Sequence, residues 1–348
     1  MRDDRVLTLL FHVLPVVLPL WTAPAEAGSL QYKKLHFTGQ QSSAAASING
    51  KGQVVGTFTD STGTHGFVWD KGVVTQVDGP GASFTELVAI NAKGIAAGDY
   101  SGTAPVGEVA FTYDTATGQQ TVLNTDSGEG TYAAGINAGG TVVGLAERGG
   151  DCEFCGFVAK GSKFRLLHAP GSPNGTFAVG IDQHGVVVGD YRARNGDSHG
   201  FLFSAGSFTS FDPPGSGATV PDFITDEGVA GGEFYTGGNE PPYTVGFTMA
   251  GGTVTNFEYP GGYYNNVVGI GPAGEVAGTW IDSVANHGFI ALGGTYYDID
   301  VPGSTNTVLT GVNQNGWLVG YFTTGTGRHP KRFAFIARCP NGQSPCTQ

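Results

Sequence analysis

The sequence predicts an all-β fold, a seven-bladed β-propeller with four-stranded antiparallel blades. Glycine, at 59 of 348 residues, is interleaved with Val, Phe and Tyr, which is typical of short strands joined by tight turns. A short motif also recurs seven times at intervals of 42 to 46 residues, the period of a four-stranded propeller blade. Its copies are Ile48-Asn49, Ile90-Asn91, Ile136-Asn137, Ile181-Asp182, Ile224-Thr225, Ile270-Gly271 and Val312-Asn313.

The first strand of each unit approaches this pair, as in Glu86 to Ile90, and an Asn-x-x-Gly hairpin turn follows, as in Asn49 to Gly52. The second strand begins with a Val-Val-Gly run such as Val54-Val55-Gly56. We expect its glycine to allow a close approach of neighbouring strands or blades near a crowded axis.

The third strand is marked by a small residue followed by phenylalanine. An aromatic at a fixed strand position in every unit predicts a packing unit between adjacent blades. A tight turn then leads to the fourth strand, which ends in Pro-Gly in five units, because proline cannot continue a ladder. The aromatic positions are Phe67, Phe111, Phe157, Phe201, Phe247, Phe289 and Phe335.

The two ends of the chain complement each other. The seventh unit stops after Arg338 without a fourth strand, whereas the isolated run from Tyr32 to Gly39 resembles one, with Leu35 to Gly39 aligned to Val77 to Gly81. The N-terminal strand is therefore expected to complete the last blade and close the ring, which removes an exposed sheet edge. We expect one propeller over residues 28–338 and a short C-terminal tail over residues 339–348.

The units resemble the bacterial extracellular HAF repeats, in which a His-Ala-Phe strand start follows an Ile-Asn-x-x-Gly-x-Val-Val-Gly hairpin. The resemblance covers Ala46 to Ile336. The tripeptide departs from that pattern, since this chain has His65-Gly66-Phe67, His199-Gly200-Phe201 and His287-Gly288-Phe289, and other units replace the histidine. The resemblance implies a secreted repeat protein and no particular biochemical activity.

Residues 1–27 are interpreted as a cleaved signal peptide. Val6 to Trp21 is nearly all apolar, and Ala23 to Ala27 offers small residues for cleavage after Ala27. A transmembrane anchor is the alternative, but the apolar run is short and contains two prolines. We therefore expect a secreted or periplasmic bacterial protein with no membrane span after cleavage.

The formal net charge of −12 disfavours nucleic acids and anionic membranes as partners. We expect a monomer with a glycan, peptide or protein ligand.

Four cysteines in an exported chain favour disulfides. Closeness in sequence favours the pairs Cys152–Cys155 and Cys339–Cys346, although three connectivities are possible. Cys152 and Cys155 also have the C-x-x-C spacing of redox and zinc sites, but they lack the second ligand pair or the βαβ context of such sites. We interpret them as a loop staple.

No local motif identifies a catalytic residue, a cofactor or a metal site. The chain contains no nucleophile elbow, phosphate loop or calcium loop. We interpret His65, His199 and His287 as packing or hydrogen-bonding residues, and the strand-end carboxylates Asp78, Asp212 and Asp300 as turn formers. Since propeller enzymes assemble sites from several blades, the absence of a local motif does not exclude an enzyme.

The loops between second and third strands differ from unit to unit, whereas the opposite hairpin turns are short and uniform. Function usually lies where a rigid scaffold carries variable loops. The sequence therefore predicts a noncatalytic propeller that binds its ligand on the loop-bearing face. The alternatives are a polysaccharide hydrolase or lyase at the channel mouth, and a structural role in which the loops vary without constraint. Candidate ligand-binding residues are Arg192, Arg194, Tyr235, Tyr243, Tyr132, Tyr263, Tyr264 and Arg328.

Overall fold

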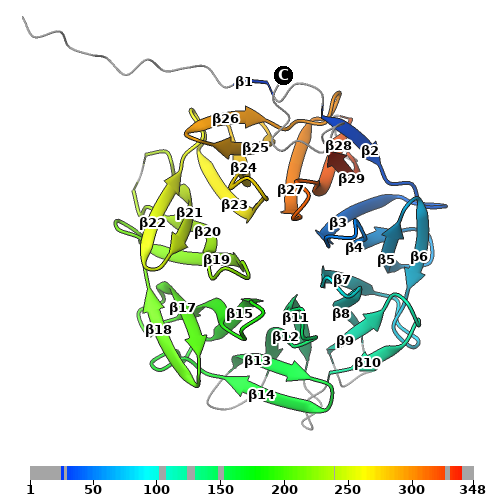
Figure 1. Cartoon of the computed structure of the whole chain (residues 1–348), viewed down its shortest axis with the longest axis horizontal. Coiled ribbons are helices and arrows are strands. Elements are labelled where there is room, and N and C mark those ends of the chain that lie inside the picture. Colours follow the sequence, from blue (N-terminus) through cyan, green and yellow to red (C-terminus); the bar gives the residue numbers. More distant parts are fainter. Residues whose placement is uncertain are drawn as a thin grey trace, which may run out of the picture.

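The computed structural model describes residues 25–26, 30–101, 107–123, 130–147, 153–238, 240–325 and 330–338. Seven sheets, each with four antiparallel strands, surround a central axis and confirm the predicted seven-bladed propeller (Figure 1). Blade 6 carries one more strand, β1 (Ala25–Glu26), which pairs parallel with β26 and precedes the predicted cleavage point. The described residues include no helix with the length and apolarity needed to cross a membrane.

The first strand of each blade lies innermost (Figure 1). In every blade its pairing with the second strand shifts by one residue, a β-bulge at the same place, as between Ala45 and Ser47. The bulge gives one residue beside the channel, such as Asp222 in blade 5, no partner in the ladder. The innermost strands are β3 (Ser42–Ile48), β7 (Thr85–Ile90), β11 (Thr131–Ile136), β15 (Thr176–Ile181), β19 (Ala218–Ile224), β23 (Tyr264–Ile270) and β27 (Asn306–Val312).

The packing of the second strands explains why the glycine of Val-Val-Gly is repeated. A methyl group at Gly56 would collide with the carbonyl oxygen of Ala44 on the innermost strand, and would lie 3.0 Å from the ring of Phe67. The expected crowding is real, and it comes from the bulged strand of the same blade. The second strands are β4 (Val54–Thr59), β8 (Ile95–Ser101), β12 (Val142–Glu147), β16 (Val187–Arg192), β20 (Ala230–Tyr235), β24 (Val276–Ile281) and β28 (Leu318–Thr324).

The third strands carry the repeated phenylalanine, which is fully buried in all seven blades. Phe67 belongs to a core cluster with Val319 and Ala334 of blade 7, so the ring does pack between blades. Burying one such side chain contributes about 1.5–3 kcal/mol, and the repeat multiplies this around the ring. The third strands are β5 (Thr64–Asp70), β9 (Glu108–Asp114), β13 (Phe154–Lys160), β17 (Ser198–Ser204), β21 (Thr244–Ala250), β25 (Asn286–Leu292) and β29 (Lys331–Arg338).

The outermost strands end the blades, and the N-terminal one closes the ring as predicted. It pairs antiparallel with β29, from Gln31 opposite Arg338 to Lys34 opposite Phe335. Leu35 then donates its backbone N–H to the carbonyl of Ala334 (2.9 Å) and is buried. The outermost strands are β6 (Val73–Val77), β10 (Gln120–Val122), β14 (Lys163–Leu167), β18 (Ser207–Phe211), β22 (Thr253–Phe257), β26 (Thr295–Asp298) and β2 (Gln31–Lys34).

The strand β2 is shorter than the predicted segment. After the Leu35 backbone bond, residues 36–39 leave the ladder and enter the interface with blade 1, where Phe37 stacks on Phe58 with ring centroids 4.9 Å apart. The closing segment therefore contributes both backbone pairing and core packing.

The repeated asparagines link successive blades. Asn49 Nδ2 donates to the carbonyl of Asn91, Asn91 to that of Asn137, and Asn137 to that of Asp182, each at 3.0 Å. Asn313 Nδ2 donates to the carbonyl of Asn49 at 2.9 Å. The Ile-Asn motif is therefore an inter-blade staple as well as a turn signal.

Candidate functional site at the channel mouth

The candidate tyrosines of blades 5 and 6 come together on the loop-bearing face. Tyr235 ends β20, Tyr243 precedes β21, and Tyr263 and Tyr264 lie where the chain enters β23. The backbone N–H of Tyr243 donates to the carbonyl of Tyr263 at 2.7 Å, which ties the blade 5 loop to the link between the blades. We call these four residues the tyrosine cluster.

The tyrosine cluster is exposed. The rings of Tyr243 and Tyr264 are in contact, with centroids 5.2 Å apart. Tyr235, Tyr263 and Tyr264 are 43%, 38% and 40% exposed, unusual for large aromatics outside an interface. The nearby charge of Glu233, followed by burial, raises the pKa of Tyr235, so its hydroxyl stays a donor at neutral pH.

A groove of about 340 Å³ adjoins the tyrosine cluster. Its walls are Pro241 and Pro242 from the blade 5 loop and the segment Glu258 to Tyr263 from the link to blade 6. Proline rings and the Tyr263 side chain make these walls largely apolar, and Glu258 adds one carboxylate, a common composition for a ligand site.

Two carboxylates lie beside the cluster. Asp222 is the bulge residue of β19, and Glu233 is on β20. Burial, the charge of Glu233 and that of Asp190 raise the pKa of Asp222 to about 7, and the Asn266 amide offsets part of this. The Asp222 side chain remains accessible to solvent, as expected of a residue that faces the channel while strands displace most of the surrounding water.

A second carboxylate set lies at blades 2 and 3. Asp99 is 1% exposed, and neither of its oxygens accepts a hydrogen bond within normal distance among the described residues. Burial and the charges of Glu86 and Glu108 raise its pKa to about 8, although the nearby Ala133 amide offsets part of the shift. Asp99 is therefore largely protonated at neutral pH.

Tyr132 belongs to this second set. Its Oη lies 2.9 Å from Glu108 Oε2 and 3.0 Å from Glu147 Oε1, so two carboxylates share one hydroxyl. Burial and these two carboxylates raise the pKa of Tyr132 well above its usual range. The described contacts of Tyr132 bind it to these carboxylates and not to the tyrosine cluster.

Blade 4 supplies Asp190 and the two candidate arginines. Burial raises the pKa of Asp190 to about 6, and Ser198 and Arg192 partly offset the shift. The Arg192 guanidinium lies over the Phe177 ring at 5.5 Å. Arg194 is exposed two residues further along the same loop. Arg328 lies outside the described residues.

The three repeat histidines stay apart and bind within their own blades, as expected. Nδ1 of His65, His199 and His287 lies 2.7, 2.8 and 2.7 Å from Asp78, Asp212 and Asp300, respectively. Each ring also lies against an aromatic residue of the second strand, for example Trp280 against His287 with centroids 4.4 Å apart. Among the described side chains, no group of three His, Cys, Asp or Glu could hold a metal ion.

The cysteine pairings stay predictions. Cys155 is buried in β13, and no cysteine among the described residues is free. Cys152, Cys339 and Cys346 lie outside the described residues.

The sequence reasoning missed the carboxylates whose pKa is raised. Asp99, Asp190 and Glu233 all follow the glycine that ends Val-Val-Gly or its equivalent, so an acid at one repeat position in three units was the available signal. Asp222 carried no such signal, because only the bulge places it beside the channel.

No family model matches the chain, and no curated protein matches it. Solved structures show the fold alone. The β-propeller domain of the Trilobed protease from Pyrococcus furiosus has a TM-score of 0.56 at 12% identity over 85% of this chain and 94% of that one. That domain is described as having an open velcro topology, whereas here β2 hydrogen-bonds to β29.

Two larger peptidases contain a similar propeller. A puromycin-hydrolysing peptidase of Mycobacterium tuberculosis has a TM-score of 0.59 at 10% identity over 93% of this chain. Acylaminoacyl peptidase of Pyrococcus horikoshii has a TM-score of 0.55 at 12% identity over 88% of this chain. This chain spans 55% and 53% of their lengths. The chain is thus a seven-bladed β-propeller similar to the propeller domains of peptidases, and no family is assigned to it.

Proposed function

We propose that this protein is an exported, noncatalytic propeller of the HAF-repeat type that binds a glycan or peptide at the tyrosine cluster. One observation carries the proposal: three exposed tyrosines from two loops gather beside the carboxylates Asp222 and Glu233 at the channel mouth. Tyrosine rings offer apolar faces and a polar tip at low entropic cost, which suits sugar rings and peptide side chains alike.

The negative charge of the site limits the classes of ligand that can bind there. Glu233 and Asp222 lie within electrostatic reach of the Tyr235 hydroxyl, and Asp190 lies within reach of Asp222. A polyanionic ligand would be repelled here, so the ligand is neutral or carries amino groups. The expected occupants are a neutral or amino-bearing oligosaccharide, or a peptide with Lys or Arg.

A glycan and peptide array probed with the purified protein tests this proposal. Tyr235→Ala should weaken binding about ten-fold or more, since truncating a central aromatic anchor costs about 2 kcal/mol. Tyr113→Ala is the matched control, because Tyr113 is partly exposed at the end of β9, near the hairpin-turn side of blade 2. Uniform absence of binding, or equal loss in both variants, contradicts the proposal.

A polysaccharide hydrolase or lyase at the same mouth is the second candidate. It is favoured by the raised pKa of Asp222 (about 7) beside the carboxyl group of Glu233. Two neighbouring carboxyl groups, one of which keeps its proton near neutral pH, are the pairing that general acid–base catalysis uses. Polysaccharide turnover that disappears in Asp222→Asn while ligand binding persists would establish this candidate over the first.

A further inference from the structure

A cavity of about 630 Å³ lies at the seam between blades 7 and 1. In the other blades a hairpin turn joins the third and fourth strands. In blade 7 these strands are β29 and β2, which come from opposite ends of the chain, so no hairpin turn joins Arg338 to Gln31. The cavity opens at this place, next to the turn residues Lys51 and Lys71 of blade 1.

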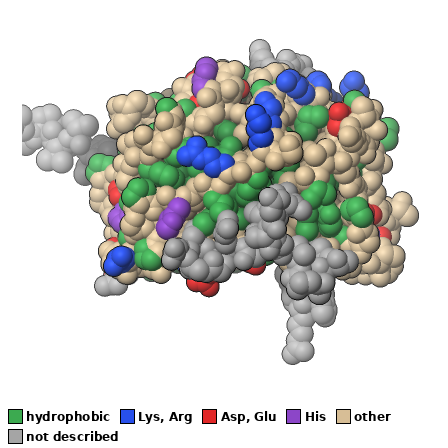
Figure 2. All heavy atoms as spheres, turned by 90° about the horizontal axis from the view of Figure 1, so that it is seen from below, with side chains coloured by type: hydrophobic (Ala, Val, Ile, Leu, Met, Phe, Trp, Pro, Cys, Tyr) green, Lys and Arg blue, Asp and Glu red, His purple; other side chains and the backbone are tan. Residues whose placement is uncertain are grey.

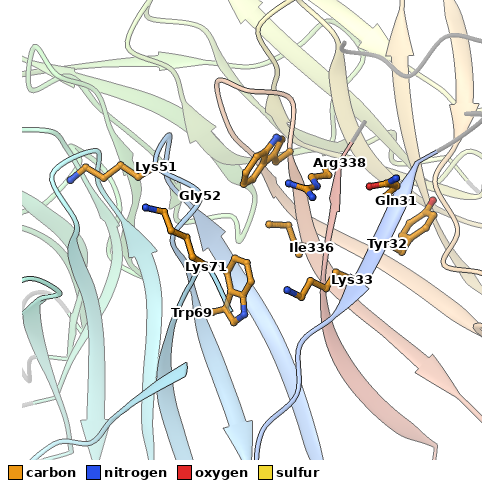
Figure 3. A pocket seen from close by; sticks show the side chains of 10 residues that line it. Gln31, Tyr32, Lys33, Lys51, Gly52, Trp69, Lys71, Ile336 and Arg338 are labelled. Atoms are coloured by element: carbon orange, nitrogen blue, oxygen red, sulfur yellow. The ribbon is translucent and has the colours of Figure 1, made fainter. Parts of the chain in front are cut away.

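Two tryptophans and an isoleucine form its apolar part. Trp69 comes from β5 of blade 1 and Ile336 from β29 (Figure 3). Trp317 comes from the hairpin that precedes β28. Trp317 is partly exposed, whereas Trp69 is only 8% exposed. The indole of Trp317 is thus the accessible platform, and Trp69 supports the opposite wall.

A cation lies over one face of each indole, and the Trp317 side chain stays partly exposed. The Lys33 ammonium lies 5.0 Å from the centre of the Trp69 ring, and the Arg338 guanidinium lies 5.6 Å from that of Trp317. Lys51 and Lys71 complete the set, and the Lys51 ammonium is held by the carbonyl of Lys93 at 2.9 Å. Figure 3 shows the four cationic groups spread around the cavity and not converging on one point.

The charge of this cavity is opposite to that of the protein. The chain has 17 Lys and Arg against 29 Asp and Glu, yet among the described residues four cations and no carboxylate line the cavity. Asp70, next to Lys71 in sequence, is bound by the Gln53 amide at 3.1 Å and lies outside the lining. A local reversal of charge on an acidic protein favours an anionic ligand.

We propose that this seam cavity binds an acidic oligosaccharide. One sugar ring lies against Trp317, and the carboxylates of the oligosaccharide lie between Lys33, Lys71 and Arg338. Its volume lies in the ordinary range for small-molecule sites, roughly 300–1,000 Å³. A compact phosphate is held by donors that converge on it, whereas cations spread over several segments match charges distributed along a chain of uronate units. This site differs from the tyrosine cluster in both place and charge.

Titration of the purified protein with trigalacturonate tests the inference, by calorimetry and by tryptophan fluorescence. We expect saturable binding, a change in fluorescence that Trp317→Phe diminishes, and affinity that falls as salt is added. The neutral trisaccharide of galactose should bind at least ten-fold more weakly. Lys33→Glu and Arg338→Glu should each weaken trigalacturonate binding about ten-fold; both side chains are exposed, so folding should survive.

Lys163→Glu supplies the matched control. Lys163 lines a groove of about 560 Å³ between blades 3 and 4 that also has cations beside aromatic rings, with Arg165 lying 5.0 Å from the Phe203 ring centre. Figure 2 shows apolar side chains flanked by Lys and Arg on the outer wall, so general attraction of anions is a real competitor. Equal loss in Lys163→Glu and Lys33→Glu would overturn the proposal.

Two further results would also overturn it: no saturable binding of trigalacturonate at millimolar concentration, and tighter binding of adenosine monophosphate than of trigalacturonate. Tyr235→Ala should leave trigalacturonate binding unchanged. This variant keeps the test of the seam cavity separate from that of the tyrosine cluster.

Discussion

Asn313 Nδ2 donates a hydrogen bond of 2.9 Å to the backbone carbonyl of Asn49, and this bond joins the last blade to the first. The same side chain accepts hydrogen bonds from the N–H groups of Asn315 and Trp317 through Oδ1, so it also shapes its own hairpin. The side-chain amide of Asn313 therefore fixes a turn and a blade interface at once. This amide and the Asn49 carbonyl that accepts from it are buried away from water.

Asn313→Asp should lower the free energy of unfolding by about 1–3 kcal/mol. The carboxylate keeps the two acceptor roles but has no proton for the Asn49 carbonyl, and it places negative charge against that oxygen. Urea unfolding measures the change. Asn315→Asp is the control for an exposed bond across the same seam, since Asn315 Nδ2 donates to the carbonyl of Gly50 at 2.8 Å where water can replace it. Unchanged stability in Asn313→Asp would show that the seam does not depend on this bond.

Asp182→Asn should have the opposite effect. Asp182 Oδ1 accepts from the N–H groups of His184 and Val186, as the asparagines do, but its carboxylate cannot donate to the next blade. An asparagine would add a hydrogen bond towards the Thr225 carbonyl and stabilise the fold by about 1 kcal/mol. A lower melting temperature in this variant would contradict the staple role of the motif.

Deletion of residues 30–39 should lower thermal stability markedly. It removes β2 together with the buried side chains of Leu35 and Phe37, leaving β29 as an exposed edge. Removal of residues 340–348 should matter less. Calorimetric melting of the two truncated proteins makes the comparison, and equal melting temperatures would refute the closure of the ring by the N-terminal strand.

Stability should fall between about pH 4 and pH 8 because of Asp99, whose pKa in the folded protein is about 8. The group ionises near pH 4 when unfolded, so within this range the folded state holds a proton that the unfolded state releases. The slope for one such group is about −1.4 kcal/mol per pH unit. Urea unfolding of Asp99→Asn at several pH values should show a shallower slope and a gain in stability at pH 8. An unchanged slope would contradict the raised pKa.

The pKa of His65 should depend on its two carboxylate partners. Burial lowers the pKa of His65, but Asp78 and Asp60 outweigh this, and the pKa lies above its usual range. The resulting stabilisation is complete below the unfolded pKa near 6.5 and disappears as pH rises through the folded value. In an NMR titration Asp78→Asn should bring the pKa of His65 down, and a higher pKa in this variant would exclude the assignment.

The scaffold could be predicted from the sequence because its constraints repeat. The seven buried phenylalanines, the Asn-x-x-Gly hairpins and the match between Leu35 and Val77 each follow from a pattern that is visible several times. The alignment of Leu35 with Val77 is correct, because the two residues occupy equivalent places in their blades. Both are buried at the end of the outermost strand, and both lie opposite the small residue that precedes the repeated phenylalanine of the third strand.

The site was less accessible to such reasoning. Variable loops pointed to Tyr235 and Tyr264, whose role in ligand binding stays a prediction. The pairing of Tyr132 with Glu108 and Glu147 depends on how two blades meet. The position of Asp222 depends on a backbone bulge, and the seam cavity exists because two chain ends replace a turn. These features arise from three-dimensional contacts that occur once, so no repeated sequence pattern predicts them.

The closing strand also sets an order of assembly. The strand β2 precedes the repeat strands of blades 1 to 6 in the chain, whereas its partner β29 follows them. Blades 1 to 6 have their four repeat strands in sequence and can form as the chain emerges, but blade 7 must wait until β29 has been made. The slowest step of folding is therefore expected to be this long-range pairing, and until it occurs the nascent ring presents open edges to chaperones and to other copies of itself.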